Sequence, residues 1–206
     1  HINLMLGKIK YTDEGVVNTM KNWKKALDAG CFIDNHQNYS WQEAQPALIN
    51  GEAAMYLMGN FLVPNLPQET QDNLDYWQFP DINPGMARGE DAPTDLIFMP
   101  ANAQNKDNAK KFLEFVAQAE NIETFAGALK NLPTHKDAAT LDDRFLEKGA
   151  KVLAASKTAQ FYDRDTTPEM ASAGMQGFQD FMLNPDDMMD ILEEIEEERA
   201  RIFGAL

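Results

Sequence analysis

Cysteine and histidine are scarce in this chain, which excludes several kinds of chemistry. The 206 residues include one cysteine, Cys31, and three histidines, His1, His36 and His135. A lone cysteine cannot form an internal disulfide, and structural zinc sites of the multi-cysteine type need more than one thiolate. The three histidines lie far apart in the sequence without the spacing of metal ligands. We therefore expect no metal and no other cofactor.

Long apolar runs are also missing. No stretch reaches the roughly 18 to 20 apolar residues that cross a bilayer, so we expect no membrane insertion. Hydrophobic residues still make up 44% of the chain, which is enough for a packed core. The sequence opens on His1, with neither methionine nor the segments of a signal peptide. This start is compatible with a trimmed cytoplasmic protein, a processed exported protein or a fragment.

Basic residues are outnumbered by acidic ones. Eighteen Lys and Arg face 33 Asp and Glu, for a net charge of −15. Such a surface repels phosphate backbones and anionic membrane faces, so we expect no nucleic-acid partner. A neutral or cationic ligand fits this charge. The alternative is that the acidity serves only solubility.

Helices dominate the predicted secondary structure. Apolar periodicity and capping residues predict helices at 13–29, after Ser40, at 107–117, 122–129, 140–155, 170–182 and 185–203. Short apolar or alternating runs predict strands at 53–58, 76–79 and 96–99, separated by a loop at 81–93. These strands are too few to complete a doubly wound sheet, which indicates that the chain is part of something larger.

Two features are predicted to be structural rather than functional. Trp23 shares a helical face with Met20 and Leu27, which favours a core position over stacking on a ligand. The glutamates between Glu193 and Glu198 lie on an amphipathic helix. That pattern is typical of a solvated face rather than a calcium site.

Three segments, in this order, resemble parts of one protein family. They are residues 48–61 (LINGEAAMYLMGNF), 95–115 (DLIFMPANAQNKDNAKKFLEF) and 127–133 (GALKNLP). They are similar to the C-terminal half of family 1 extracellular solute-binding proteins, the maltose-binding-protein-like group. Phe61 stands close to the position where that family usually has a tryptophan.

The resemblance implies a helix-rich α/β fold of the periplasmic-binding-protein type II, with two lobes joined by a hinge and sugar held in the cleft. The chain would be truncated and consist mostly of the C-terminal lobe. Residues 1–98 would form the first part of that lobe, residues 99–138 would pack on the N-terminal lobe, and residues 139–206 would close the C-terminal lobe.

The function implied by the resemblance is extracytoplasmic binding of a mono- or oligosaccharide for delivery to an ABC importer. The partners would be the carbohydrate and the importer's permease subunits. The full-length protein would be a monomer in the periplasm or outside the cell, where a surface lipoprotein is one form. One alternative is a fragment of a glycoside hydrolase or other carbohydrate-active enzyme. Another is a helical interaction protein without a small ligand. Against the enzyme, the sequence shows no nucleophile–base pair and no glycine-rich phosphate loop.

A sugar offers hydroxyl groups in the ring plane and apolar C–H faces, so its site combines amide or carboxylate groups with aromatic rings. Asn60 and Phe61 supply both kinds of group directly after a predicted strand and Gly59. Asp95 precedes the predicted hinge strand, where it can face the cleft. The structural alternatives are a turn asparagine, a core phenylalanine and a surface acid.

The segment 161–169 gathers aromatic, acidic and basic side chains in one predicted loop. Asp163 and Arg164 are the candidates there, because a carboxylate and a guanidinium can each bind neighbouring hydroxyls. The alternative is a structural cluster of ion pairs. Asp163 and Asp165 are similar to a glycosidase carboxylate pair, but residues two apart on one loop rarely flank a bond from opposite sides.

Overall fold

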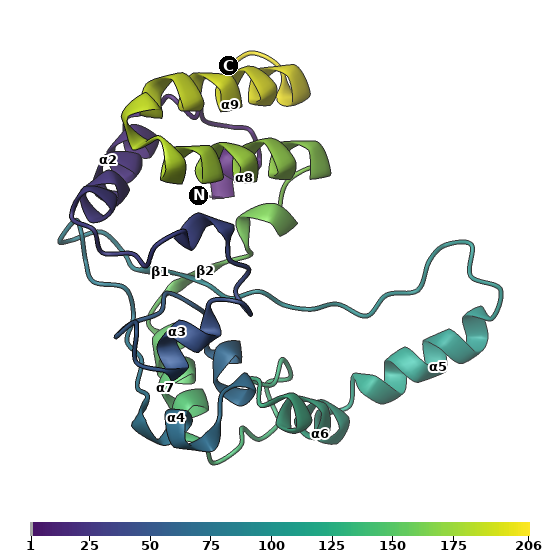
Figure 1. Cartoon of the computed structure of the whole chain (residues 1–206). Helices are drawn as coiled ribbons and strands as arrows, with labels where there is room; N and C mark the ends of the chain where they lie inside the picture. The colour runs from purple at the N-terminus through teal and green to yellow at the C-terminus, as the bar shows by residue number, and fades with distance from the viewer. Residues whose placement is uncertain (1) are drawn as a thin grey trace. The chain divides into compact units, whose positions relative to one another are not determined.

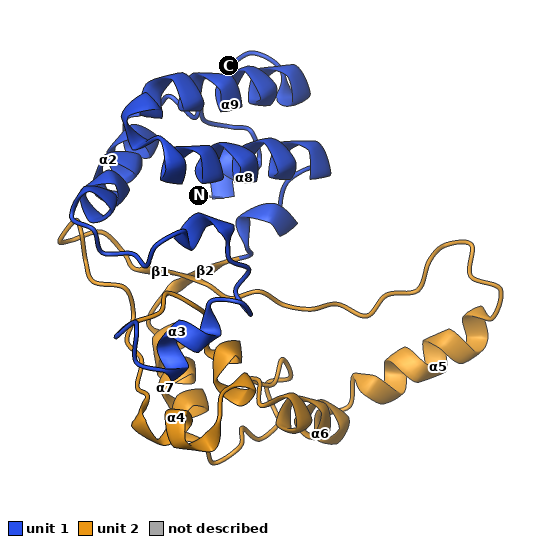
Figure 2. Cartoon of the chain, in the orientation of Figure 1, with its two compact units in different colours: residues 1–54, 160–206 blue, residues 55–159 orange. Residues whose placement is uncertain are grey.

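The computed structural model describes residues 2–206, which form two compact units (Figures 1 and 2). Unit 1 contains residues up to Ala54 and then Gln160–Leu206, and unit 2 is Met55–Ala159. The chain thus leaves unit 1 once and returns to it. Each unit has its own contacts and is described by itself. No helix between residues 2 and 206 combines the length and apolarity that a membrane span requires.

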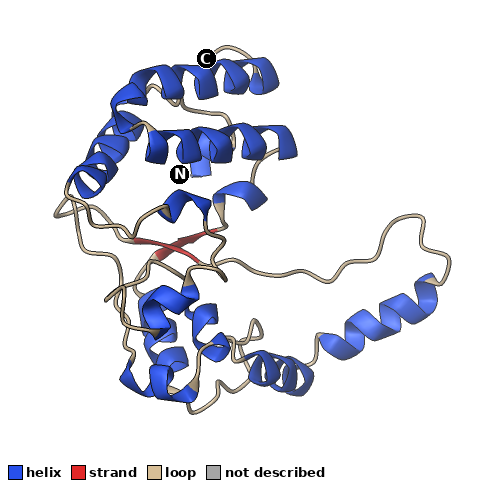
Figure 3. Cartoon of the chain, in the orientation of Figure 1, coloured by secondary structure: helices blue, strands red, loops and turns tan. Residues whose placement is uncertain are grey.

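Unit 1 is built of helices (Figure 3). Its elements are α1 (Ile2–Met5), α2 (Glu14–Asp28), the 3-10 helix η1 (His36–Asn38), α3 (Gln45–Ile49), η3 (Tyr162–Arg164), α8 (Pro168–Leu183), η4 (Pro185–Asp187) and α9 (Met188–Phe203). The predicted helices at 13–29, 170–182 and 185–203 are therefore confirmed.

The core of unit 1 lies between α2, α8 and α9. Met20, Phe181 and Leu192 are among its buried side chains. Trp23 packs on this core, with its ring centroid 5.1 Å from that of Phe181. The predicted core position of Trp23 is confirmed. Burying an apolar side chain of this size contributes about 1.5–3 kcal/mol, which is why three amphipathic helices suffice to hold the unit.

Local signals explain where several helices begin. The Oγ1 of Thr167 accepts a hydrogen bond from the Met170 N–H and caps α8. Ser40 and Glu43 exchange the two hydrogen bonds of a capping box, but they open the turn at 41–44, and α3 itself begins at Gln45 with Ala44 as its N-cap. Thr12 is the N-cap that the helix predicted from residue 13 implies, but Asp13 holds that position. The Asp13 carboxylate accepts a bond from the Lys10 N–H instead of capping the helix.

Unit 2 combines short helices with a small sheet. Its elements are η2 (Asn60–Asn65), α4 (Gln68–Asn73), β1 (Gly89–Asp91), α5 (Lys106–Val116), α6 (Ala119–Leu129), α7 (Arg144–Ala154) and β2 (Lys157–Ala159). β1 and β2 pair in parallel, with Gly89 opposite Lys157 and Asp91 opposite Ala159. The helix-rich composition with a parallel pair of strands agrees with the predicted α/β class.

The three predicted strands are wrong for this chain. Residues 53–58, 76–79 and 96–99 are not assigned to a sheet, and β1 lies inside the segment predicted as a loop. The apolar side chains of these segments are largely exposed, including Leu57 at 77% and Phe98 at 79%. A strand needs a neighbour for its backbone groups, and between residues 2 and 206 the only described ladder is β1–β2.

The helices α5 and α6 form where the sequence predicts them, but their apolar faces are open. No residue of α5 is buried, and Ala126 is the one buried residue of α6. Phe112, Phe115 and Phe125 are each more than half exposed. Exposed large aromatic side chains that lie together are uncommon on a monomeric protein and are typical of an interaction surface.

Candidate functional site

The structure places Asn60 and Phe61 together at the start of η2. Gly59 precedes them in an extended conformation, and the ring of Phe61 folds back over it. A Cβ at Gly59 would overlap that ring, so a larger residue there would displace Phe61 from this position. Leu62 and Val63 are buried and fix η2 in unit 2, while Asn60 and Phe61 are half-buried. The pair therefore combines an amide and an aromatic ring on a supported turn.

Asn60 has a neighbour that the sequence analysis did not indicate. A Cβ at Gly149 in α7 would lie 3.7 Å from the Asn60 Nδ2 and 3.1 Å from the Tyr76 hydroxyl oxygen. Both polar atoms thus lie beside the same point of the α7 backbone. The sequence analysis did not include Tyr76 in the site, because the residues around it are typical of a strand. Its proximity to Gly149 could not be predicted either, because the two residues are far apart in the sequence.

Tyr76 is held firmly in this position. Its ring stacks on Phe145, with centroids 6.1 Å apart, and its hydroxyl donates to the Phe145 carbonyl oxygen at 2.9 Å. Lys148 places its ammonium 5.2 Å from the ring centroid. Burial, together with nearby carboxylates, raises the pKa of Tyr76 to about 12. The phenol therefore keeps its proton well above physiological pH, and its oxygen can still accept a hydrogen bond from a neutral hydroxyl.

Asp95 lies elsewhere in unit 2. It is exposed, in the extended stretch between β1 and α5 that Figure 2 shows within unit 2. The segment around Asp95 is not a strand, so the predicted position before a hinge strand is not found. Asp95 stays a predicted ligand contact.

Asp163 and Arg164 lie together in η3 of unit 1, and both are exposed. The guanidinium of Arg164 stands over the ring of Phe161, 5.5 Å from its centroid. The Arg164 N–H donates to the Phe161 carbonyl oxygen at 3.1 Å and closes the turn. Asp163 and Arg164 are thus neighbours on one short turn. The preceding residue, Tyr162, packs against the core of unit 1.

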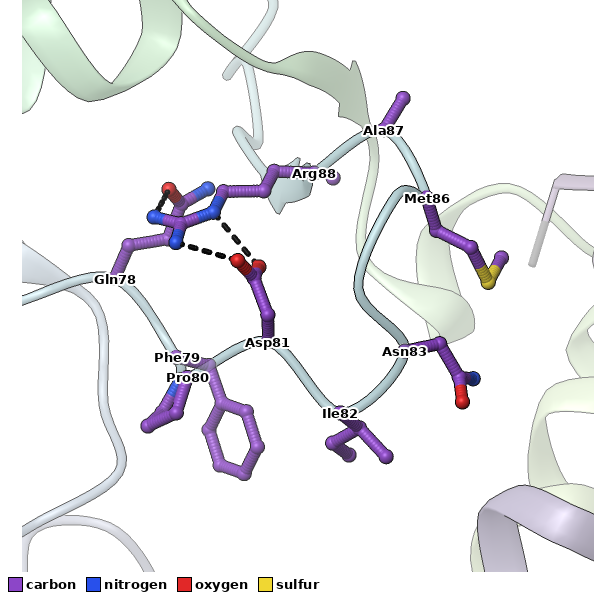
Figure 4. Close-up of a pocket in the computed structure, with 10 residues that line it drawn as sticks. Gln78, Phe79, Pro80, Asp81, Ile82, Asn83, Met86, Ala87 and Arg88 are labelled. Atoms are coloured by element: carbon purple, nitrogen blue, oxygen red, sulfur yellow. Dashed lines mark hydrogen bonds and ion pairs between the residues drawn. The ribbon is translucent and has the colours of Figure 1, made fainter.

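A hollow of about 240 Å³ lies in unit 2 along residues 78–89 (Figure 4). Arg88 closes it by donating from Nε and Nη2 to the Asp81 carboxylate, at 2.8 Å each, and from Nη1 to Gln78 at 2.9 Å. Arg88 also holds the pKa of Asp81 below its usual range. The polar groups here satisfy one another, and the volume falls short of the roughly 300 Å³ at which ligand sites begin. None of the predicted site residues lines it.

The candidate residues thus fall in three places, of which two are in unit 2 and one is in unit 1. Their chemistry is that of amide, carboxylate, guanidinium and aromatic groups, which bind neutral polar ligands through hydrogen bonds and ring stacking. Among residues 2–206, no three His, Cys, Asp or Glu side chains form a group that could hold a metal ion.

Comparison with known proteins relates this architecture to transport receptors. The family model for bacterial extracellular solute-binding proteins matches residues 4–154. An uncharacterised ABC transporter extracellular-binding protein of Pyrococcus horikoshii is 32% identical over 126 residues, which cover 60% of this chain and 28% of that protein. A putative binding protein of Brucella abortus is 28% identical over 129 residues, covering 62% of this chain and 31% of that protein.

Among solved structures, the bacterial solute receptor AcbH superposes with a TM-score of 0.90 at 28% sequence identity. The match covers 98% of this chain and 53% of the AcbH chain. AcbH is described as having an exclusive substrate preference for β-D-galactopyranose. The chain therefore spans about half the length of this receptor, and its matched part spans less than a third of the two sequence relatives. The predicted fold class, a partial periplasmic-binding-protein-like fold, is confirmed.

Proposed function

The chain belongs to the bacterial extracellular solute-binding protein family, and on that basis we propose that it binds a carbohydrate outside the cytoplasm for delivery to an ABC importer. The observation that carries the proposal is the match to AcbH over 98% of the chain, a receptor described as a β-D-galactopyranose binder. The family and fold are those of a transport receptor. We infer that the protein transforms no substrate.

The proposed partners follow from this role. A receptor of this kind hands its ligand to the permease subunits of the importer, so the protein would act as a monomer in the periplasm or at the cell surface, where a lipid anchor is one form. The net charge of −15 favours an uncharged ligand such as a sugar over a phosphorylated one, because an acidic surface repels anions.

The proposed ligand contacts are Asn60, Phe61, Asp95, Asp163 and Arg164. Phe61 would stack on an apolar face of the sugar ring, and the other four would bind hydroxyls. Such pairing of a ring with planar polar groups is how sugar sites obtain both affinity and orientation. The Tyr76 hydroxyl lies near the Asn60 amide and is the first further contact to consider.

We also propose that residues 99–138 pack against the N-terminal lobe that the family resemblance implies. In support, this segment contains α5 and α6, whose phenylalanines at 112, 115 and 125 are more than half exposed. The predicted lobe boundaries at 98/99 and 138/139 lie within unit 2. In this arrangement the sugar would be enclosed by groups from both lobes.

Calorimetric titration tests the proposed function. The protein in its natural length is titrated with a panel of mono- and oligosaccharides that begins with D-galactose. We expect saturable heat with at least one sugar, and no turnover of aryl glycosides. Absence of binding to every sugar in the panel by a correctly folded protein would contradict the proposal, and glycoside turnover would favour an enzyme.

Phe61→Ala tests the proposed site. Loss of one stacked ring should weaken sugar binding by about 1 kcal/mol, roughly fivefold in Kd, beyond the effect of lost apolar area. The control is Phe32→Ala, because Phe32 is 42% exposed, stacks on His36 and is not among the proposed contacts. An unchanged Kd in Phe61→Ala would remove Phe61 from the site.

A further inference from the structure

Beside the proposed contacts Asp163 and Arg164 lies a pair of tyrosines whose hydroxyls bond to each other. The Tyr11 and Tyr162 hydroxyl oxygens are 2.5 Å apart, although 151 residues separate them in the sequence. We propose that Tyr11 and Tyr162 are positioning residues, which hold η3 so that Asp163 and Arg164 are presented to the ligand. This inference rests on the proposed function and deepens it.

Tyr162 is fixed on several sides within unit 1. Its hydroxyl lies 3.3 Å from the Met170 carbonyl oxygen, to which it donates, and its ring meets Phe178 edge-on at 5.4 Å. α8 provides room for this phenol only because residue 174 is glycine, since a Cβ at Gly174 would overlap the Tyr162 hydroxyl. Tyr162 is thereby seated on α8 and cannot shift without breaking these contacts.

The direction of the hydrogen bonds follows from the donor count. A phenol carries one O–H donor and also accepts. Because the Tyr162 O–H donates to Met170, Tyr11 must donate to the Tyr162 oxygen. Burial raises the pKa of both tyrosines, so both phenols keep their protons at neutral pH and the chain of bonds persists.

Tyr11 is anchored in turn by the ion pair between Glu196 and Arg199. Its side chain is fully buried, and its backbone N–H donates to the Glu196 carboxylate at 2.9 Å. Glu196 also binds the buried Arg199 at 2.7 Å. Contacts from α9 therefore hold Tyr11, and Tyr11 holds Tyr162, so the position of Tyr162 does not depend on η3 alone.

Asp163 and Arg164 follow Tyr162 directly in one turn, so their backbone is placed by the Tyr162 anchor. Thr167 fixes the far end of the segment by capping α8. Both candidate side chains remain exposed while the turn beneath them is held. A contact loop that is ordered before binding loses less conformational entropy on binding, which increases affinity.

Tyr11→Phe tests the inference, since it removes one hydroxyl and keeps the ring. We expect amide hydrogens of residues 160–167 to exchange roughly five- to tenfold faster without sugar, because one buried hydrogen bond is lost. We expect sugar affinity to fall by a similar factor. Tyr162→Phe should give the same result while retaining the ring packing on Phe178. Tyr39→Phe is the control, because Tyr39 is 45% exposed and lies outside this network.

The two readouts separate the possible failures. Unchanged exchange at 160–167 in both variants would overturn the positioning role. An equal increase in α9 would mean a general loss of stability and would overturn it as well. Faster local exchange with unchanged sugar affinity would show that η3 is held but is not part of the site, which also overturns the inference. If the unaltered protein binds no sugar, the proposed function itself fails, and the exchange data still decide whether the tyrosines hold η3.

Discussion

Replacing Glu196 with alanine should destabilise unit 1, because the buried positive charge of Arg199 would lose its partner. Arg199 is 1% exposed, and its guanidinium binds the Glu196 carboxylate from Nε at 2.9 Å and from Nη2 at 2.7 Å. Its Nη1 donates to the carbonyl oxygens of Gly7 and Gly204. Without Glu196 the positive charge stays buried with neutral carbonyls alone, and the Tyr11 N–H loses its acceptor.

The size of the effect follows from burial. Removing one partner of a buried ion pair costs about 3–5 kcal/mol. Glu196 keeps 17% of its side chain exposed, so water can partly replace it, and we expect about 3 kcal/mol. For a chain of this length that corresponds to a fall in Tm of roughly 6–12 °C. Glu196→Gln should lose less, because its amide oxygen can still accept the hydrogen bonds.

Thermal unfolding followed by circular dichroism measures this effect. Glu193→Ala is the control, because Glu193 is exposed on the same helix and surface changes usually remain within about 0.5 kcal/mol. If the Tm of Glu196→Ala lies within about 1 °C of that of the unaltered protein, the ion pair between Glu196 and Arg199 does not stabilise unit 1 as argued.

The same pair predicts a dependence on pH. Burial alone would raise the pKa of Glu196, but hydrogen bonds from Arg199 and the Tyr11 backbone outweigh it and lower the pKa. A lowered folded-state pKa means that the stabilisation is complete above the unfolded value of about 4.3 and is lost as the pH falls through the folded pKa. The difference in Tm between Glu196→Ala and the unaltered protein should therefore shrink as the pH falls from 7 towards 3.

Three further predictions concern packing, capping and local stability. Gly177→Ala should lower the free energy of unfolding by about 1–3 kcal/mol in thermal melts, since a Cβ there would overlap Ile195. The control is Gly15→Ala, which should be neutral or stabilising by up to about 1 kcal/mol, because the space around Gly15 is open. Asp143→Ala should cost about 1 kcal/mol in denaturant titration, because the carboxylate caps two N–H groups of α7, while Asp142→Ala should cost little. Hydrogen exchange should be faster in α5 than in α9, because no residue of α5 is buried; equal protection would contradict this.

The long helices were predictable because their signals are local. The helix predicted at 13–29 is α2 at Glu14–Asp28, and the Asn184–Pro185 start leads through η4 into α9. A cap, first-turn acids and a periodic apolar face all lie within the segment itself. The exception is α7, because the helix predicted from residue 140 begins only at Arg144, where Asp143 is the N-cap. Several residues that can cap a helix lie close together before α7, and the sequence alone does not show which of them is the N-cap.

Contacts between distant segments were not predictable in this way. Arg199 lies near the C-terminal end of α9, where a basic side chain complements the helix dipole, but it is buried against the carbonyls of Gly7 and Gly204, near opposite ends of the sequence. The neighbourhood of Asn60, Tyr76 and Gly149 likewise joins a turn, an extended segment and a helix. Nothing in the local sequence around any of these residues indicates its partner, because the partner is chosen by the fold.

The strand predictions failed for a different reason, since a strand is not a local structure. Residues 53–58 and 96–99 carry apolar runs typical of buried strands, and in the structure Leu57, Leu96 and Phe98 are 77–79% exposed. Helix hydrogen bonds close within a segment, whereas strand hydrogen bonds require a second edge. The proposed second lobe would offer such an edge and would cover the exposed phenylalanines of α5 and α6. The proposed second lobe would thus account both for the absence of strands at these segments and for the open helical faces, and the match to 53% of the AcbH chain is consistent with this proposal.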